Sequence, residues 1–441
     1  MERSVERYLI EWKHSKDRLP LLIRGARQVG KTYIIEAFGK KHFENSLVIN
    51  FEQQREYLAC FNTLYPKQIL NLIYTLSGKS ITPGKTLLFL DEIQECPNAI
   101  LALRYFYEQM PELHIIAAGS LLEFVIRNPN FRMPVGRIQS CYIKPLSFKE
   151  YLMANKKNQL IEYIEKITLR DPAEPVIHNQ LLTLIKEYLV LGGMPAVIQQ
   201  YLNTGSFEQS QIRQNVILET YRGDFGKYAK HTDIKYLQTL YDKTPGLVGK
   251  HCKYADFDPH MQSRYLKRAI NDLKDAGVIY TIHSSKANAL PLISTINEKK
   301  FKLLFLDVGL VNNVTKLSAQ VLMSDDILLI HQGMLAEQFV AQELLAYAPC
   351  YREENLFFWE RDKKTSNAEI DYIIAIDSLI LPIEVKAGTT GRLRSLQLFL
   401  EEKNSSLGIR ISQKELSYHN KVLSIPFYMI SEISRLVSAL Q

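Results

Sequence analysis

Residues 25–32 of this chain read Gly25-Ala26-Arg27-Gln28-Val29-Gly30-Lys31-Thr32. Two glycines separated by four residues and followed by lysine and threonine form the pattern of a phosphate-binding loop. The apolar run 21–23 precedes the loop as a buried strand would, and residues 32–38 continue as a helix. This order of strand, loop and helix lets the loop N–H groups and the helix N-terminus point at a phosphate.

The loop predicts an ATP site. Lys31 is expected to reach the β- and γ-phosphates, and Thr32 is expected to hold Mg²⁺ through its hydroxyl. The expected nucleotide-binding residues are the loop and the start of the helix, namely Gly25, Ala26, Arg27, Gln28, Val29, Gly30, Lys31, Thr32 and Tyr33.

Two further apolar strands supply the polar groups that hydrolysis needs. Residues 87–90 end in Asp91, which is expected to hold Mg²⁺ through a water, and in Glu92, the candidate general base for the attacking water. Residues 114–118 lead to Ser120, which either senses the γ-phosphate at the same sheet edge or caps the next helix.

Developing charge on the transferred phosphoryl group also calls for an arginine. Arg137 is the first candidate, and Arg127 is the second. Either could instead be an ordinary surface arginine. The sequence leaves open whether Arg137 would act in its own subunit or across an interface.

Composition describes an ordinary globular protein. The chain has 441 residues, of which 46% are hydrophobic and 23% are charged. No apolar run approaches 18 residues, and the N-terminus lacks the apolar core of a signal peptide, so we expect a cytoplasmic protein without membrane contact. Five scattered cysteines indicate neither a disulfide framework nor a zinc site. A net charge of +7 permits contact with nucleic acid without requiring it.

Four domains are expected along the chain. Residues 180–189 form an amphipathic helix that Gly192-Gly193 should stop. The polar stretch 361–367 is short enough to be a loop. The expected domains are an ATPase core at 1–155, a helical lid at 156–230, a winged helix-like domain at 231–320 and an α/β domain at 321–441.

The third of these domains is the candidate DNA-binding part. Short helices precede a longer one at 261–276, and a strand follows, which is the order of a winged helix-turn-helix. Its apolar stripe is Leu266, Ile270 and Leu273. Another face of the same helix carries Arg264, Lys267, Arg268, Asn271 and Lys274. That face could lie in a DNA groove, or it could simply be solvated.

A second candidate site lies in the last domain. Asp371 belongs to one predicted strand, and Glu384 and Lys386 project from the same side of the next. Two carboxylates can hold a second Mg²⁺ or Mn²⁺, and a lysine can position a water. Glu337 in the preceding helix would complete this nuclease-like site. As ordinary strand-end charges, the same residues would need no functional explanation.

The whole chain resembles the bacterial and archaeal AAA-type P-loop ATPases that carry a C-terminal DUF4143 domain, which is PD-(D/E)xK nuclease-like. The resemblance is carried by motifs that occur in order, at residues 22–32, 90–94, 136–137, 145–148, 192–195, 369–371 and 384–386. Ile370 stands where a proline often precedes the first acid. The resemblance implies the α/β fold class: a P-loop NTPase (AAA-type) core with helical lid, a winged helix-turn-helix and a C-terminal restriction-endonuclease-like α/β domain.

The leading hypothesis is an ATP-hydrolysing switch or motor that acts on double-stranded DNA. The alternative is a signalling ATPase that binds an unidentified protein partner and uses the nuclease-like fold as a non-cleaving scaffold. A third interpretation is a toxin or defence component that requires a trigger. A homo-oligomer is compatible with each of these.

Overall fold

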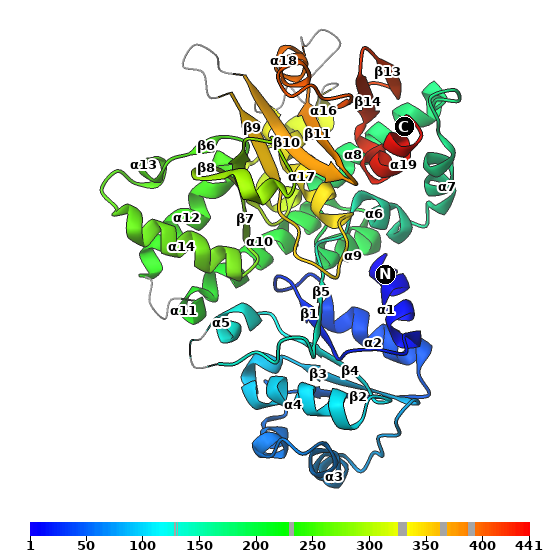
Figure 1. Cartoon of the computed structure of the whole chain (residues 1–441), viewed down its shortest axis with the longest axis vertical. Helices are drawn as coiled ribbons and strands as arrows, with labels where there is room; N and C mark the ends of the chain where they lie inside the picture. The colour runs from blue at the N-terminus through cyan, green and yellow to red at the C-terminus, as the bar shows by residue number, and fades with distance from the viewer. Residues whose placement is uncertain (128, 130, 229–232, 325–332, 362–367, 387–392) are drawn as a thin grey trace. The chain divides into compact units, whose positions relative to one another are not determined.

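The computed structural model describes residues 1–127, 129, 131–228, 233–324, 333–361, 368–386 and 393–441. Most of the predicted polar loop at 361–367 therefore lies outside the described residues. The chain divides into two units (Figure 1). The first unit contains Met1–Lys144, Asp275–Gly277 and Pro349–Glu353, and the second contains Pro145–Lys274, Val278–Ala348 and Glu354–Gln441.

A parallel sheet forms the centre of the first unit. Its strand order is β2-β3-β4-β1-β5, and every neighbouring pair is parallel. The strands are β1 (Leu21–Arg24), β2 (Asn45–Asn50), β3 (Thr86–Asp91), β4 (His114–Ala118) and β5 (Gln139–Tyr142). β1, β3 and β4 consist of apolar runs that are almost completely buried, as expected for parallel strands covered on both faces.

Helices cover both faces of this sheet. Leu88 and Leu90 belong to an apolar cluster with η1, α3 and α4, whereas Leu87 packs against Gly39 of α2 on the opposite face. This division follows from the alternation of side chains along β3. The helical segments are α1 (Val5–His14), α2 (Lys31–His42), η1 (Arg55–Asn62), α3 (Pro66–Ser77), η2 (Ile93–Glu95), α4 (Pro97–Gln109) and α5 (Leu122–Ile126).

The second unit begins with a helical region. Ser147 and Glu150 form a reciprocal capping box that starts α6, and α8 ends before Gly192, which has a φ of +74°. The stop predicted at Gly192 is therefore confirmed. These helices are α6 (Phe148–Ala154), α7 (Asn158–Lys166), α8 (Pro175–Leu191), α9 (Pro195–Thr204), α10 (Phe207–Gly223) and α11 (Phe225–Tyr228).

No single helix among the described residues combines the length and apolar character needed to cross a membrane, although α8 and α9 meet those criteria when taken together across a bend of 117°.

Further along the second unit, the described residues include strands from distant segments that form one sheet of nine strands. Its order is β13-β14-β12-β11-β10-β9-β7-β8-β6. The strands are β6 (His251–Cys252), β7 (Ile279–Ser285), β8 (Ile296–Phe305), β9 (Phe357–Glu360), β10 (Glu369–Ile376), β11 (Leu379–Val385), β12 (Gly408–Ser412), β13 (Ser417–His419) and β14 (Val422–Pro426).

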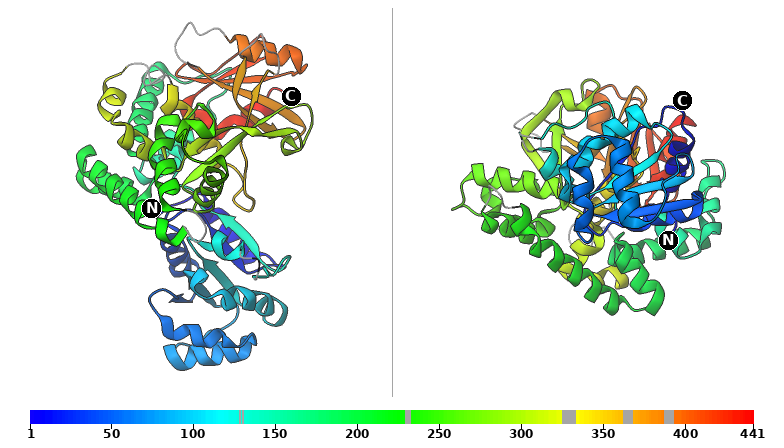
Figure 2. Two further views of the ribbon diagram at one scale, coloured as in Figure 1. Left: turned by 90° about the vertical axis from the view of Figure 1, so that its left-hand side faces the viewer. Right: turned by 90° about the horizontal axis from the view of Figure 1, so that it is seen from below.

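The same part of the chain contributes the other helices of the described residues. They are α12 (Ile234–Leu247), α13 (Tyr254–Phe257), α14 (Ser263–Asp275), η3 (Leu292–Thr295), α15 (Val308–Thr315), α16 (Ser318–Met323), α17 (Met334–Ala346), α18 (Arg394–Glu402), η5 (Phe427–Glu432) and α19 (Ile433–Ser438). Figure 2 shows α18 in orange beside the strands of the same colour, and α18 packs against β10 and β11.

The pairing of β7 with β9 joins two segments, 231–320 and 321–441, that the sequence suggested as separate domains. β6 and β7 each pair antiparallel with β8, and β7 also pairs in parallel with β9. β9 in turn pairs with β10, so the segments 231–320 and 321–441 share a single sheet. The domain boundary that the sequence suggested near residue 320 therefore falls between strands that pair within the same sheet.

Candidate functional site

The carboxyl ends of three parallel strands collect the predicted nucleotide-site residues. The phosphate-binding loop follows β1, Asp91 ends β3, and Ser120 follows β4. Since parallel strands end at a common edge, side chains from residues far apart in sequence meet there. This is the edge at which open α/β sheets bind ligands.

Close backbone approach shapes the loop. Gly25 has a φ of +142°, and a Cβ on it would lie 2.3 Å from the carbonyl oxygen of Ile143. Gly30 has a φ of +93° and immediately precedes α2. Arg3, which the sequence gave no reason to select, donates to the carbonyl of Val29 at 3.1 Å. The loop thus needs both glycines and is fixed from outside by a buried arginine.

Lys31 is folded back onto the loop. Its ammonium donates to the carbonyl oxygens of Gly25 at 2.9 Å and Ala26 at 2.7 Å. Burial lowers the pKa of Lys31 to about 8, although nearby Glu92 and Asp91 act in the opposite direction. A buried cation held by carbonyl oxygens can exchange them for phosphate oxygens, which would stabilise its charge more strongly.

Thr32 and Asp91 form the pair expected for magnesium. The Thr32 hydroxyl donates to Asp91 Oδ2 at 2.9 Å, and the amide of Asn50 at the end of β2 donates to the same oxygen at 3.2 Å. Burial raises the pKa of Asp91 above its ordinary value. A hydroxyl and a carboxylate are hard oxygen donors of the kind that Mg²⁺ prefers, so these residues fit that ion.

Glu92 is held in an uncommon backbone conformation. Its φ is +48°, in the left-handed region that non-glycine residues rarely adopt. Its Oε2 accepts hydrogen bonds from the Gln94 amide at 2.6 Å and from the Ser120 hydroxyl at 3.3 Å. A Cβ at position 119 would meet Gln94 Oε1 at 2.4 Å, so Gly119 leaves room for that amide. Ser120 thus contacts the candidate base directly.

The other predicted nucleotide-binding residues are placed as follows. Gln28 has a φ of +63°, and Val29 and Ala26 are buried. Tyr33 is exposed on α2, and its hydroxyl accepts a hydrogen bond from the Met1 amino group at 2.9 Å. Arg27 is half-buried beside the loop. Their contact with nucleotide stays a prediction.

Arg137 lies toward the opposite edge of the sheet. It precedes the amino end of β5, whereas the loop follows the carboxyl end of the neighbouring β1. Its Nε donates to Glu108 at 3.1 Å, near the end of α4 that leads into β4. At about 3.3 Å per residue, roughly 15 Å of strand separates Arg137 from the level of the loop. Arg127, the second candidate, forms an ion pair with Asp275.

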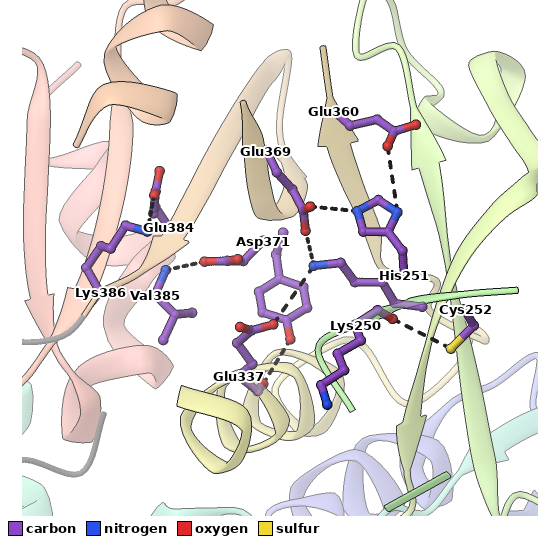
Figure 3. A network of polar contacts seen from close by, with 12 residues as sticks. Lys250, His251, Cys252, Glu337, Glu360, Glu369, Asp371, Glu384, Val385 and Lys386 are labelled. Carbon is purple, nitrogen blue, oxygen red and sulfur yellow. Dashed lines mark hydrogen bonds and ion pairs between the residues drawn. The ribbon is translucent and has the colours of Figure 1, made fainter. Parts of the chain in front are cut away.

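The structure brings the four residues of the predicted nuclease-like site within electrostatic reach of one another, since Asp371 acts on the pKa values of Glu337, Glu384 and Lys386. Asp371 Oδ2 accepts from the backbone N–H of Val385 at 2.7 Å (Figure 3). Glu384 pairs with Lys386 at 2.8 Å, and burial raises the pKa of Glu384. No three His, Cys, Asp or Glu side chains among the described residues are arranged to hold a metal ion.

Lys302 of β8, which the sequence gave no reason to select, lies beside Glu337 and beside Glu369, a further acid on β10. Its side chain is 3% exposed, and its Nζ contacts the carboxylate of Glu369 and lies 3.9 Å from Glu337 Oε2. Glu369 also pairs with His251 Nε2 at 2.6 Å. Burial, and then the charge of Asp371, raise the pKa of Glu337 to about 8.

α14 carries the predicted apolar and basic faces. Leu266, Ile270 and Leu273 are buried, which confirms the apolar stripe. On the basic face, the side chains of Arg264, Lys267 and Asn271 are exposed, and those of Arg268 and Lys274 are half-buried. Lys267 lies 4.0 Å from Glu298 of β8.

Two sequence motifs without an assigned role, residues 145–148 and 192–195, hydrogen-bond to two buried acids, Glu343 and Asp307. Asp307 Oδ2 accepts from the N–H of Gly193 at 2.6 Å, and Asp307 Oδ1 accepts from Leu310 at 3.1 Å, which caps α15. For these residues the sequence predicted only that Gly192-Gly193 would stop the preceding helix. Glu343 accepts from the N–H of Phe148 through both oxygens, at 3.0 and 3.1 Å. Burial raises the pKa of Asp307 to about 6 and that of Glu343 to about 8.

Comparison with known proteins identifies three matched segments. Residues 17–152 match the model of an AAA domain. Residues 182–321 match a domain of unknown function (DUF8612), and residues 332–428 match a domain of unknown function (DUF4143).

One curated relative is an uncharacterized protein of Methanocaldococcus jannaschii, with 24% identity over 272 residues. The alignment covers 57% of this chain and 56% of that protein, so the chain spans little more than half the length of this relative.

Two solved structures show a distant likeness. The Aeropyrum pernix ORC1 protein in complex with DNA has 11% identity and a TM-score of 0.28, over 71% of this chain and 90% of that chain. AMPPCP-bound DnaA from Aquifex aeolicus has 13% identity and a TM-score of 0.27, over 61% and 86% respectively. At such TM-scores the likeness is too distant to inform fold or function.

Proposed function

Because this chain belongs to the AAA-type P-loop proteins that carry a C-terminal DUF4143 domain, we propose that it hydrolyses ATP and acts on DNA. The observation that carries the hydrolysis proposal is the grouping of Lys31, Thr32, Asp91 and Glu92 at one sheet edge. Each of these side chains provides a function that phosphoryl transfer to water requires.

In this proposal the chain's own groups bind, orient and remove a proton. Lys31 gives up its carbonyl partners and binds the β- and γ-phosphates. Glu92, oriented by Gln94 and Ser120, accepts a proton from the attacking water. Thr32 and Asp91 would hold Mg²⁺, which neutralises charge on the phosphates when it is bound.

Arg137 fits this chemistry only as a residue supplied by a second copy of the chain. Its pairing with Glu108 near the amino edge of the sheet keeps it away from its own loop. We therefore propose that a homo-oligomer places Arg137 beside the neighbour's γ-phosphate, where an arginine stabilises the transition-state charge.

The DNA part of the proposal rests on segment 231–320. Three helices, α12 to α14, combine with the antiparallel β6-β8-β7 sheet, and this order supports a winged helix. The basic face of α14 offers Arg264 and Lys267 at the surface for phosphate contacts. Such contacts contribute most of the affinity of non-specific DNA binding.

ATP turnover in the presence of duplex tests this proposal. We expect duplex to stimulate phosphate release by the wild type, and Arg264→Gln/Lys267→Gln to lose that stimulation while keeping basal turnover. Lys166→Gln, which removes an exposed lysine from α7, is the matched control. DNA affinity should also fall steeply with salt, because each phosphate contact releases counterions.

A second candidate function is an ATP-driven switch that grips a protein partner, with the C-terminal domain as a scaffold that does not cut. The burial of Lys302 among the acids of that domain favours this candidate over an ATPase-coupled nuclease. Turnover that is unchanged by duplex would select the protein-directed switch.

A further inference from the structure

The turn that ends α14 belongs to the first unit, as does the phosphate-binding loop. This turn is Asp275–Gly277, and the chain enters it directly from α14. Gly277 has a φ of +72°, and the N–H of Val278 donates to the carbonyl of Leu273 at 2.9 Å. A left-handed glycine and a hydrogen bond over five residues are the marks of a capped helix end. The turn is therefore a defined structure and can transmit a displacement.

Gly277 packs against the phosphate-binding loop. A Cβ at this position would lie 3.1 Å from Ala26 Cβ and 3.2 Å from both Ala26 Cα and Ala26 N. The carbonyl of Ala26 is one of the two that hold the Lys31 ammonium, at 2.7 Å. Position 277 thus needs glycine both for its backbone conformation and for space. A shift of Gly277 would move the loop residue that contacts Lys31.

Asp275 contacts another part of the same site. It forms an ion pair with Arg127, and its own side chain is 5% exposed, so solvent screens this pair less than it screens a surface pair. The N–H of Arg127 closes α5 by donating to the carbonyl of Glu123 at 3.0 Å. α5 begins two residues after Ser120, whose hydroxyl lies 3.3 Å from Glu92. The ion pair therefore anchors the segment that carries Ser120.

We propose that Gly277 and Asp275 are positioning residues of the nucleotide site. Gly277 fixes the loop that binds phosphate, and Asp275 fixes the segment that contacts the candidate base. This inference rests on the ATP hydrolysis proposed above. Because the turn continues from α14, a ligand that displaces the end of this helix also displaces Ala26 and Arg127. The turn is thus the route by which binding at α14 changes ATP turnover.

The affinity of the full chain for a fluorescent ATP analogue tests the role of Gly277. Gly277→Ala places a methyl group against Ala26, so we expect affinity to fall about tenfold and KM to rise similarly, with kcat little changed. Gly78→Ala is the matched control. Gly78 follows α3 with a φ of +66°, and a Cβ on it would meet no described atom within 4 Å. Both changes should lower Tm through the same backbone strain, but Gly78→Ala should keep the affinity.

Steady-state phosphate release tests the role of Asp275. Asp275→Asn removes the charge and keeps the shape, so we expect kcat to fall about fivefold with unchanged affinity, because the segment that carries Ser120 loses its anchor. Asp242→Asn, which breaks a surface ion pair with Arg222, should keep the wild-type kcat. Arg127→Gln added to Asp275→Asn should lower kcat no further, since both changes break one pair.

Hydrogen exchange tests the connection to α14. If the nucleotide site and the turn are coupled, the coupling acts in both directions. A bound non-hydrolysable ATP analogue should therefore slow amide exchange at residues 275–278 at least about threefold in the wild type. Gly277→Ala, measured at a saturating concentration of the analogue, should lose most of this protection.

Each measurement can overturn the proposal. Equal affinities of Gly277→Ala and Gly78→Ala would remove the role of Gly277, and wild-type kcat in Asp275→Asn would remove that of Asp275. Exchange at residues 275–278 that does not respond to nucleotide would contradict the connection to α14. If Gly277→Ala fails to fold, Asp275→Asn and the wild-type exchange measurement still decide. A wild type that binds the analogue but releases no phosphate would contradict the proposed hydrolysis, whereas the affinity of Gly277→Ala would still test the turn.

Discussion

The side-chain amide of Gln94 donates a hydrogen bond of 2.6 Å to the carboxylate of Glu92. Gln94 lies two residues after Glu92 in the chain, and the left-handed backbone of Glu92 brings the two side chains together. Gly119 provides the space that the amide needs. The candidate base is thus oriented by a residue that does not itself act on the phosphate.

Loss of Gln94 should slow turnover without weakening nucleotide binding. We expect Gln94→Ala to lower kcat by about tenfold, as a fraction of the 10²- to 10⁴-fold that a general base contributes. KM for ATP should change little. Steady-state phosphate release measures both. Gln109→Ala, at an exposed position of α4, is the control, and an equal effect of the two changes would contradict the positioning role.

Nucleotide affinity should depend on the charge of Lys31. Because burial lowers the pKa of Lys31 to about 8 and bound phosphate favours the ammonium, affinity should fall as the pH rises above 8. The expected slope is about tenfold per pH unit. Lys31→Ala should lose binding at every pH, whereas Lys40→Ala, at an exposed position of the same helix, should keep it. Titration with a fluorescent ATP analogue from pH 7 to 9.5 measures both.

Mixing two inactive variants tests the role of Arg137. Arg137→Ala should reduce turnover by about 10³-fold or more if it stabilises the transition state. Combined with Glu92→Gln, which keeps Arg137, it should regain activity, since one subunit supplies the base and its neighbour the arginine. Arg104→Ala, which removes the other arginine that pairs with Glu108, should stay active. A mixture no more active than its components would contradict action across an interface.

Protein stability should fall with rising pH because of Glu343. Its pKa is about 8 in the folded protein and near 4.5 ordinarily, so between these values the folded state holds a proton that the unfolded state has released. The free energy of unfolding therefore decreases by up to about 1.4 kcal/mol per pH unit in this window. Urea unfolding at pH 5, 6, 7 and 8 measures this slope.

Glu343→Gln should reduce that slope by the share of Glu343, since the amide does not titrate and can still accept from Phe148, while Glu337 and Asp307, whose pKa values are also raised, continue to contribute. Glu162→Gln, an exposed position on α7, should keep the wild-type slope. Identical slopes in all three proteins would show that Glu343 does not retain its proton on folding.

The sequence predicted those parts of the molecule whose structure follows from the residue pattern of one short segment. The phosphate-binding loop, the apolar strands that lead to Asp91 and Ser120, the apolar stripe of α14 and the strands β10 and β11 follow from short segments. A parallel sheet then brings the strand ends together by geometry alone. The positions of these residues could therefore be predicted, whereas their roles in catalysis stay predictions.

Long-range contacts were not predictable in this way. Lys302 belongs to the run Lys299-Lys300-Phe301-Lys302, whose lysines suggest an exposed strand, and only the sheet pairing of β8 buries it. Asn50 and Arg3 likewise acquire partners only after folding. The sharing of one sheet by segments 231–320 and 321–441 depends on the β7-β9 pairing, which leaves no local signature.

Phosphate release from MgATP by Glu92→Gln, with a nucleotide-binding titration of the same preparation, tests the central claim most directly. Glu95→Gln, a nearby exposed carboxylate, is the control. We predict that Glu92→Gln binds ATP as the wild type does and turns it over at least about 100-fold more slowly, because it lacks the base. Hydrolysis by Glu92→Gln at the wild-type rate would contradict the assignment of Glu92.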